Sequence, residues 1–221
     1  MSKIRVAFYD AKEYDINSFE KANNESEIEI SYFETKLNED TVKLSEGYDV
    51  VCVFVNDTVS KNVIDSLCNN GVKLIALRCA GYNNVDIEHA FGKIHIVRVP
   101  AYSPYAVAEH AMALLLTSVR RIHKAYNRTK DFNFSLSGLT GFDLHGKTVG
   151  VIGTGKIGRI FIDICRGFGM NVIAYDKFPA KDSNIEYVEL EALFERSDII
   201  SFHCPLTDEN RHMVNPESIE K

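Results

Sequence analysis

The residues best suited to chemistry are three glycines, Gly153, Gly155 and Gly158, in the run Gly-Thr-Gly-Lys-Ile-Gly. A GxGxxG run between a strand and a helix is typical of a loop that binds the pyrophosphate of a dinucleotide. The first glycine permits a tight turn, the second lets the backbone approach the phosphates, and the third lets the helix pack closely on the strand. The N-terminus of the helix offers free N–H groups and the positive end of its dipole to the anion.

The segments on both sides of this run fit a dinucleotide-binding unit. A short apolar strand, 148–152, precedes it, and an amphipathic helix, 156–168, follows it. A second strand, 171–175, ends directly before Asp176, which lies 18 residues after the last glycine. A carboxylate there accepts hydrogen bonds from the adenosine ribose and repels a 2′-phosphate, so Asp176 favours NAD over NADP. The alternative is a turn that merely needs glycines, which would leave the strand, the helix and the acid unexplained.

Predicted strands and helices alternate along the whole chain, which indicates an α/β fold with parallel sheets. Strands are expected at 4–9, 27–33, 49–55, 72–77, 95–99, 148–152, 171–175 and 199–203. Helices are expected at 61–68, 85–91, 103–130, 156–168 and 190–196, and another is expected to begin at Pro216. The long helix has Ser103 as its N-cap and Pro104 at its first position. The segment 131–145 is rich in serine and glycine, which favours a domain boundary there.

Composition excludes several classes of protein. The chain has 221 residues, 45% hydrophobic and 25% charged, with a net charge of -6, so it should be globular and have no electrostatic attraction to nucleic acid or anionic membranes. The basic cluster 120–124 is expected to be a solvated helix face. The longest apolar runs, 50–55 and 111–116, fall far short of the roughly 18 residues of a membrane helix. Five cysteines without CxxC spacing indicate neither a zinc site nor a disulfide framework, and a reducing cytoplasm is the expected location.

Several motifs together give the chain a resemblance to a known family. It resembles the D-2-hydroxyacid dehydrogenases, and within them the fermentative D-lactate dehydrogenases. The resemblance covers essentially the whole chain and is carried by 78–86 (RCAGYNNVD), 98–104 (RVPAYSP), 107–111 (VAEHA), 120–123 (RRIH), 139–142 (LTGF), 150–158 and 201–207 (SFHCPLT). Many proteins share the glycine motif, but far fewer combine the PAYSP and RCAG segments.

The resemblance implies the domain organisation. A flavodoxin-like substrate domain would occupy 1–102, an interdomain helix and linker 103–145, and the first, incomplete part of a Rossmann NAD-binding domain 146–221. In this family the active site lies in the cleft between the two domains. The resemblance also implies homodimers or larger assemblies, built around the nucleotide domain and the long helix.

The resemblance further assigns binding residues. The backbone N–H groups of Cys79, Ala80 and Gly81 would form a nest for the substrate carboxylate, and Tyr102 would reach the substrate from the PAYSP segment. On the cofactor side, beyond the glycines and Asp176, the matching residues are Lys156 and Ile157 at the diphosphate, Cys204 and Pro205 along the adenine and nicotinamide side, and Asn210. No metal is expected.

Each substrate-side residue also has a structural interpretation. Tyr102 could cap the long helix and fill a crevice, and Cys79 could be a small buried apolar residue with an inert side chain. His110 and His123 are expected to be structural histidines with satisfied hydrogen bonds. His203 is expected to lie near the cofactor without touching it. Arg78, which precedes the nest, could position the loop without contacting substrate.

The chain departs from the family in one respect. Members use an arginine, a histidine and a glutamate for catalysis, and the resemblance places all three beyond residue 221, so no catalytic residue is assigned here. The 1–221 chain alone is therefore expected to be inactive.

The expected activity of the complete enzyme is NAD-dependent interconversion of pyruvate and D-lactate. Two alternatives remain: an NADH-sensing, corepressor-like binding module of the same fold, and a dehydrogenase of bulkier D-2-hydroxy acids.

Overall fold

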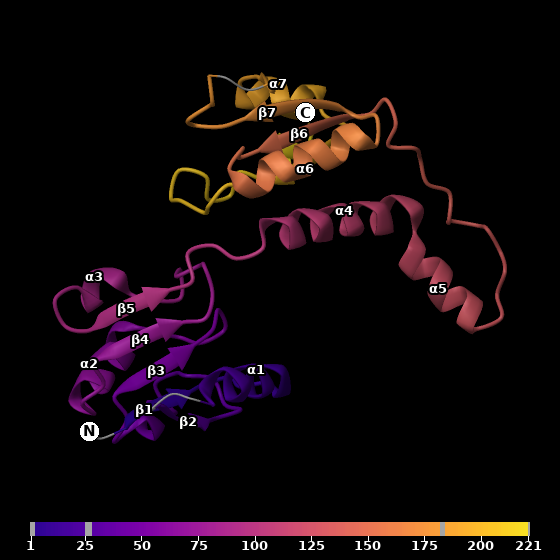
Figure 1. Ribbon diagram of the computed structural model, residues 1–221. Helices are drawn as coiled ribbons and strands as arrows, with labels where there is room; N and C mark the ends of the chain where they lie inside the picture. The colour runs from indigo at the N-terminus through magenta and orange to yellow at the C-terminus, as the bar shows by residue number, and fades with distance from the viewer. Residues whose placement is uncertain (1–2, 25–27, 182–183, 221) are drawn as a thin grey trace. The chain divides into compact units, whose positions relative to one another are not determined.

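The computed structural model describes residues 3–24, 28–181 and 184–220. The chain divides into two compact units, Met1–Tyr102 and Ser103–Lys221 (Figure 1). The units meet at Tyr102 and Ser103, and not in the segment 131–145, whose composition favoured a boundary.

The first unit is a five-stranded parallel sheet with the strand order β2-β1-β3-β4-β5. This is the flavodoxin-like order. In chain order its elements are β1 (Ile4–Phe8), α1 (Glu13–Asn23), β2 (Ile28–Tyr32), η1 (Val42–Ser45), β3 (Val50–Val53), α2 (Lys61–Asn69), β4 (Leu74–Leu77), α3 (Ile87–Ala90) and β5 (His95–Arg98). The central strands carry buried apolar side chains on both faces, which explains their continuous apolar runs.

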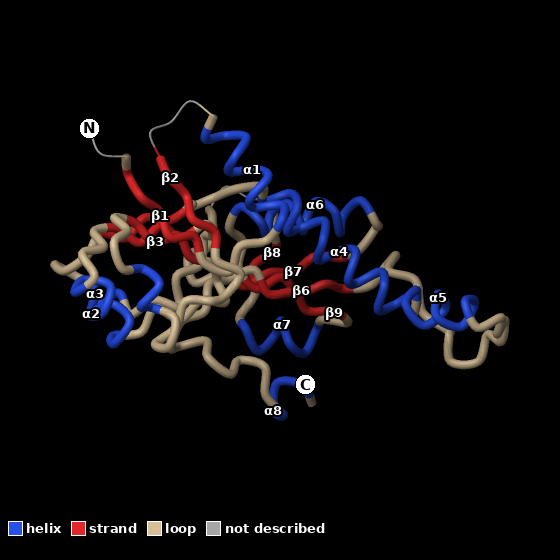
Figure 2. Tube along the Cα trace, turned by 90° about the horizontal axis from the view of Figure 1, so that it is seen from below, coloured by secondary structure: helices blue, strands red, loops and turns tan. Residues whose placement is uncertain are grey.

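The second unit contains a four-stranded parallel sheet with the order β8-β7-β6-β9. This order corresponds to strands 3-2-1-4 of a Rossmann fold. Its elements are α4 (Pro104–Arg120), α5 (Ile122–Lys130), β6 (Thr148–Ile152), α6 (Lys156–Gly167), β7 (Asn171–Tyr175), β8 (Glu186–Tyr187), α7 (Leu190–Arg196), β9 (Ile199–Phe202) and α8 (Pro216–Ile219). Figure 2 shows the strands of each unit gathered in a separate sheet. The predicted fold class is therefore confirmed.

The long helix α4 belongs to the second unit because of its packing. It lies along α6 (Figure 1), and its side chains Ala108, Met112 and Val119 are buried in one core with Phe161 and Cys165 of that helix. The segment 131–145 is thus a loop within this unit.

One prediction of secondary structure needs correction. The long helix does not continue to Lys130, because Arg121 adopts a left-handed conformation (φ 54°) and separates α4 from α5. The strand β8, the helix α1 and the short 3-10 helix η1 were not predicted. The helix α1 has few apolar residues, and two of them, Tyr14 and Phe19, are exposed. Glu27, where the second strand was expected to begin, lies outside the described residues.

Candidate functional site

The glycine loop between β6 and α6 has the geometry that its sequence predicts. A Cβ on Gly153, whose φ is +93°, would lie 2.6 Å from the backbone nitrogen of Cys204. A Cβ on Gly158 would lie 2.0 Å from the carbonyl oxygen of Gly153, so helix and loop can approach only without a side chain there. Around Gly155, the N-cap of α6, a Cβ would meet no atom within 4 Å. The middle glycine therefore leaves its backbone open for a ligand, whereas the outer two are required by the protein itself.

Asp176 closes the loop from the end of β7. Its Oδ2 accepts hydrogen bonds from the backbone N–H (2.6 Å) and hydroxyl (2.8 Å) of Thr154, and its Oδ1 accepts one from the N–H of Phe178 (2.9 Å). Desolvation raises the pKa of this carboxyl, but these hydrogen bonds and the nearby Arg159 outweigh it and hold the pKa below its usual value. Asp176 is therefore ionised at neutral pH. A carboxylate has about four lone-pair sites, so one on Oδ1 is left for a ribose hydroxyl.

A cavity of about 510 Å³ lies at the carboxyl ends of these strands. Of the predicted cofactor residues, it is lined by Gly153, Gly155, Asp176, Cys204, Pro205 and Asn210. Lys156, Ile157 and Gly158 are absent from its lining: Lys156 is exposed at the start of α6, Ile157 packs towards the core, and Gly158 is buried against the loop. Ligands of open α/β sheets bind at this edge, beside the strand where the order reverses.

Asn210 has a structural task at this cavity. Its Nδ2 donates to the carbonyl of Pro205 (2.7 Å), and its Oδ1 accepts from the N–H of Thr207 (2.7 Å). The side chain therefore shapes the segment after β9 that forms one wall. Lys177 and Glu209 also line the cavity, and they form an ion pair with each other.

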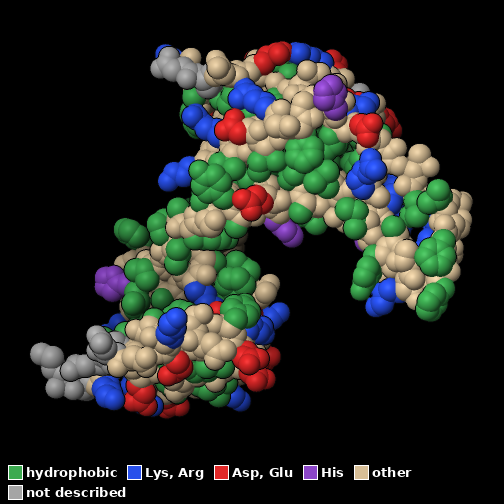
Figure 3. All heavy atoms as spheres, turned by 45° about the vertical axis from the view of Figure 1, so that its right-hand side comes forward, with side chains coloured by type: hydrophobic (Ala, Val, Ile, Leu, Met, Phe, Trp, Pro, Cys, Tyr) green, Lys and Arg blue, Asp and Glu red, His purple; other side chains and the backbone are tan. Residues whose placement is uncertain are grey.

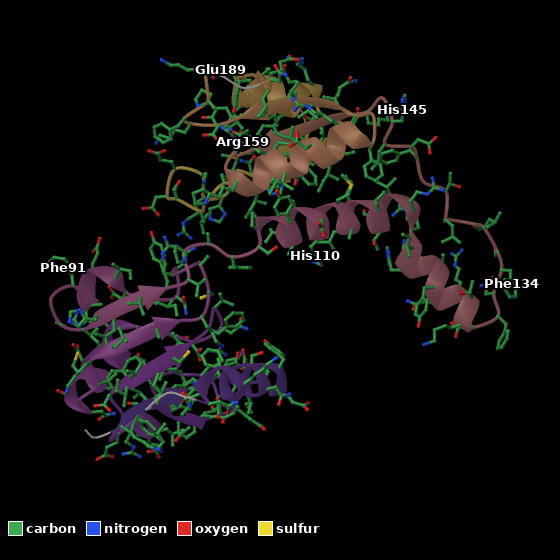
Figure 4. All side chains as sticks on the ribbon, in the orientation of Figure 1. Phe91, His110, Phe134, His145, Arg159 and Glu189 are labelled. Carbon is green, nitrogen blue, oxygen red and sulfur yellow. The ribbon has the colours of Figure 1, made fainter. Side chains whose placement is uncertain are left out.

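Sequence reasoning missed Thr154, although it lies inside the glycine motif. Its hydroxyl joins Asp176 to the hydroxyl of Tyr187 (2.9 Å), and Arg159 donates to its carbonyl (2.9 Å). Figure 4 shows Arg159 on α6. A hydroxyl residue next to the first glycine, with an acid at the end of the next strand, is the signal that could have identified it.

His203 lines the same cavity. Its Nε2 lies 2.9 Å from the hydroxyl of Ser201, its ring packs on Phe161 at 4.9 Å, and burial lowers its pKa. The residue is thus a neutral wall of the cavity at neutral pH.

His110 and His123 do not fit the expectation of packed structural histidines, because both are exposed. Figure 4 shows His110 on the face of α4 that is turned away from α6.

The Cys79–Gly81 loop follows β4 in the first unit. Within the described part of the chain, the backbone N–H groups of these three residues donate no hydrogen bond. The Cys79 side chain is buried, its Sγ donates to the carbonyl of Gly81 (3.3 Å), and burial raises its thiol pKa. The neutral thiol of Cys79 therefore braces the loop. Tyr102 is 63% exposed at the end of the first unit, and no described hydrogen bond or ring contact joins it to this loop.

Arg78 turns away from the loop that it precedes. Its guanidinium lies between the rings of Phe8 (4.4 Å) and Phe54 (4.9 Å), donates to the carbonyl of Asp10 (2.8 Å), and faces Asp15 (3.6 Å). Arg78 therefore links the end of β1 and the helix α1 to the segment that follows β3.

The described residues contain neither a metal site nor a membrane helix. No group of three or more His, Cys, Asp or Glu residues among them could hold a metal ion. None of the helices in the ranges 3–24, 28–181 and 184–220 has both the length and the apolar character needed to span a membrane.

Comparison with known proteins agrees with this geometry. Residues 112–221 match the model of the "D-isomer specific 2-hydroxyacid dehydrogenase, NAD binding domain". The chain is 50% identical to D-lactate dehydrogenase of Escherichia coli (strain K12) over 99% of its own length and 68% of that enzyme. The chain belongs to the D-2-hydroxyacid dehydrogenase family. It is also 50% identical to a 2-hydroxyacid dehydrogenase homolog of Haemophilus influenzae, over 99% of this chain and 67% of that protein.

Solved structures of dehydrogenases give the same result. The apo-structure of D-lactate dehydrogenase from Escherichia coli matches with a TM-score of 0.90 and 49% identity, covering 98% of this chain and 70% of that one. D-lactate dehydrogenase from Aquifex aeolicus, complexed with NAD and lactic acid, matches with a TM-score of 0.80 and 33% identity, covering 97% and 65%. The chain described here is therefore an oxidoreductase with an NAD-binding domain. The open backbone at Gly155 and the ionised Asp176 fit that cofactor.

Proposed function

We propose that this protein is an NAD-dependent D-lactate dehydrogenase that interconverts pyruvate and D-lactate. The observation that carries the proposal is the presence of two anion sites of different kinds, one in each unit. One is the open backbone at Gly155, at the N-terminus of α6. The other is the set of free N–H groups of Cys79, Ala80 and Gly81. A dinucleotide pyrophosphate suits the first site and a small carboxylate suits the second.

On the cofactor side, the start of α6 would hold the pyrophosphate. The N–H groups of Gly155, Lys156 and Ile157 begin the helix and lack partners of their own within it, so they can donate to phosphate oxygens. Asp176 would accept a ribose hydroxyl on its remaining Oδ1 site, and its charge would repel a 2′-phosphate. Cys204, Pro205 and Asn210 would form the wall along the adenine and nicotinamide.

On the substrate side, the nest would hold the carboxylate of pyruvate. Three N–H groups stabilise an anion through hydrogen bonds without adding a titratable charge, so substrate binding would not depend on the ionisation of a side chain in the loop. Tyr102 would contribute its exposed hydroxyl to the substrate. When bound, NADH supplies the hydride, while the protein orients the partners and excludes water.

The direct test is steady-state kinetics of the full-length gene product. Oxidation of NADH with pyruvate, and reduction of NAD with D-lactate but not with L-lactate, would support the proposal. Binding of NADH without turnover of any 2-keto acid would contradict it and would favour a corepressor-like NADH sensor.

A dehydrogenase of bulkier D-2-hydroxy acids remains the second candidate. A structural relative is a D-2-hydroxyisocaproate dehydrogenase, with a TM-score of 0.79 and 31% identity. Comparison of kcat/KM for pyruvate and for a branched 2-keto acid of six carbons separates the two, because the nest and cofactor would serve both equally.

We further propose a homo-oligomeric enzyme in the cytoplasm. Figure 3 shows hydrophobic side chains on the surface, and Phe132, Phe134 and Leu136 after α5 are 85%, 74% and 80% exposed. Figure 4 shows Phe134 projecting from this loop. Such exposed apolar residues are typical of a contact with another chain. Light scattering gives the mass of the full-length protein, and a monomeric mass would contradict the proposal. A lower mass for Phe134→Ser than for the wild type would place the contact at this loop. All five cysteines are free thiols, which fits a reducing compartment.

A further inference from the structure

The carbonyl groups of the Cys79–Gly81 loop are held by donors from the neighbouring strand. The carbonyl of Ala80 accepts a hydrogen bond of 2.6 Å from Nη1 of Arg98, the last residue of β5. The carbonyl of Cys79 accepts one of 3.2 Å from the N–H of Val99. Two consecutive peptide groups of the loop are therefore fixed through their oxygens.

Fixing a carbonyl also fixes the next N–H. In a trans peptide the C=O and the following N–H point in opposite directions, and none of the described peptides is cis. The Gly81 N–H must therefore point away from the Arg98 guanidinium, and the Ala80 N–H away from Val99. Arg98 thus aims a donor of the nest without occupying the space that an anion would take.

The charge of Arg98 adds to this effect. A hydrogen bond from a guanidinium to a carbonyl is charge-assisted, and it polarises the peptide so that the N–H at the other end becomes a stronger donor. The guanidinium also lies over the ring of Tyr82 at 5.2 Å, which restricts its side chain.

We propose that Arg98 is a positioning residue for the substrate carboxylate, acting through the Ala80–Gly81 peptide. This rests on the proposed function, in which the nest binds the carboxylate of a 2-keto acid. Arg98 itself touches no substrate, and its effect reaches the ligand through the N–H of Gly81.

The first unit contains a matched control for this arrangement. Arg5 of β1 donates from Nη1 to the carbonyl of Gly47 (2.9 Å) and lies over the ring of Tyr48 at 4.8 Å. The chemistry is the same as at Arg98, but Gly47 is not part of the nest. Arg5→Met therefore reports what losing such a contact does to the fold alone.

The experiment compares Arg98→Met and Arg5→Met in the full-length enzyme. For Arg98→Met we expect the KM for pyruvate and the dissociation constant of oxamate, an unreactive analogue, to rise about tenfold. The kcat at saturating pyruvate and the KM for NADH should stay within about twofold of wild type, because only ground-state carboxylate binding is weakened. Arg5→Met should change none of these, and Arg98→Lys, which keeps a charged donor, should lie between wild type and Arg98→Met.

Equal values of KM and of oxamate binding in the two Met variants would overturn the proposal, as would a fall in NADH affinity in Arg98→Met. Melting temperatures are measured for every variant, and Arg98→Gln is judged by the same criteria if Arg98→Met does not fold. If the wild type reduces no 2-keto acid but binds oxamate, the proposed function fails while oxamate binding still tests Arg98. A wild type that neither reduces a 2-keto acid nor binds oxamate overturns both proposals.

Discussion

The two candidate binding loops, Gly153–Gly158 and Cys79–Gly81, each follow a buried parallel strand, yet they are shaped by different forces. The conformation of the first loop requires glycines, because side chains at Gly153 or Gly158 would collide with the backbone. The second is shaped by added contacts from Arg98, Val99 and the Cys79 thiol. A loop defined by steric exclusion should fail abruptly when a methyl group is added. A loop defined by hydrogen bonds should weaken gradually when one is removed.

The largest expected effect is that of Gly158→Ala. Its Cβ would meet the carbonyl oxygen of Gly153 at 2.0 Å, and neither backbone can move without disturbing the strand–helix packing. We expect a loss of about 3 kcal/mol in the free energy of unfolding, measured by denaturant titration, as for overpacked cores. NADH binding should be lost as well.

Two other glycines serve as controls for this substitution. Gly167 lies in the last turn of α6, where an added methyl group would meet no atom within 4 Å, so Gly167→Ala should stabilise the helix by about 0.5 kcal/mol. Gly155→Ala should fold normally but bind NADH poorly, because only the ligand needs that space. Normal stability of Gly158→Ala would refute the steric explanation.

The next effect is that of Asp176→Ala. Removing the carboxylate should weaken NADH binding roughly ten- to hundredfold and NADPH binding much less, because a charge-assisted hydrogen bond is lost while a repulsion disappears. Fluorescence titration with both cofactors measures this. Asp163→Ala removes an exposed acid of α6 and should change neither affinity. An unchanged preference in Asp176→Ala would show that another residue selects the cofactor.

A smaller effect is expected for Tyr102→Phe. If the Tyr102 hydroxyl contacts substrate, the KM for pyruvate should rise about fivefold, in the range of one neutral hydrogen bond, with NADH affinity unchanged. Tyr105, which is similarly exposed one turn further along the chain, provides the control Tyr105→Phe. Identical pyruvate kinetics in both variants would favour a packing role for Tyr102.

The smallest effect is a pH dependence of stability that arises from His203 in the second unit. Burial holds the pKa of His203 below 6.5, so the folded state binds this proton less readily than the unfolded chain. The contribution of neutral, buried His203 to the free energy of unfolding is fully present above pH 6.5. It is lost as the pH falls from there through the pKa of His203 in the folded state. His203→Gln should therefore flatten the fall in unfolding free energy between about pH 7 and pH 5. The Cys79–Gly81 loop should not make the free energy of unfolding depend on pH in this range, because burial raises the pKa of Cys79 and keeps its thiol protonated. If the free energy of unfolding of His203→Gln depends on pH as strongly as that of the wild type, another group is responsible for the pH dependence.

Features that depend on a local sequence pattern could be predicted, whereas features that depend on contacts between distant residues could not. The alternation of strands and helices and the glycine motif with Asp176 are local patterns, and the structure has both. The break at Arg121 could not be predicted, because a left-handed backbone (φ 54°) is unusual for an arginine and no glycine or proline marks the position in the sequence. The contact of Arg98 with Ala80 was equally invisible, because it joins residues 18 apart through a long flexible side chain.

The packing of α4 decides where this gene can be cut. The serine- and glycine-rich loop 131–145 looks like a natural linker, but a fragment that began at residue 146 would leave behind Ala108, Met112 and Val119. It would expose the apolar face of α6 that they cover, and we expect such a fragment to aggregate. A cut between Tyr102 and Ser103 instead leaves each half with its own core and keeps the N-cap with its helix.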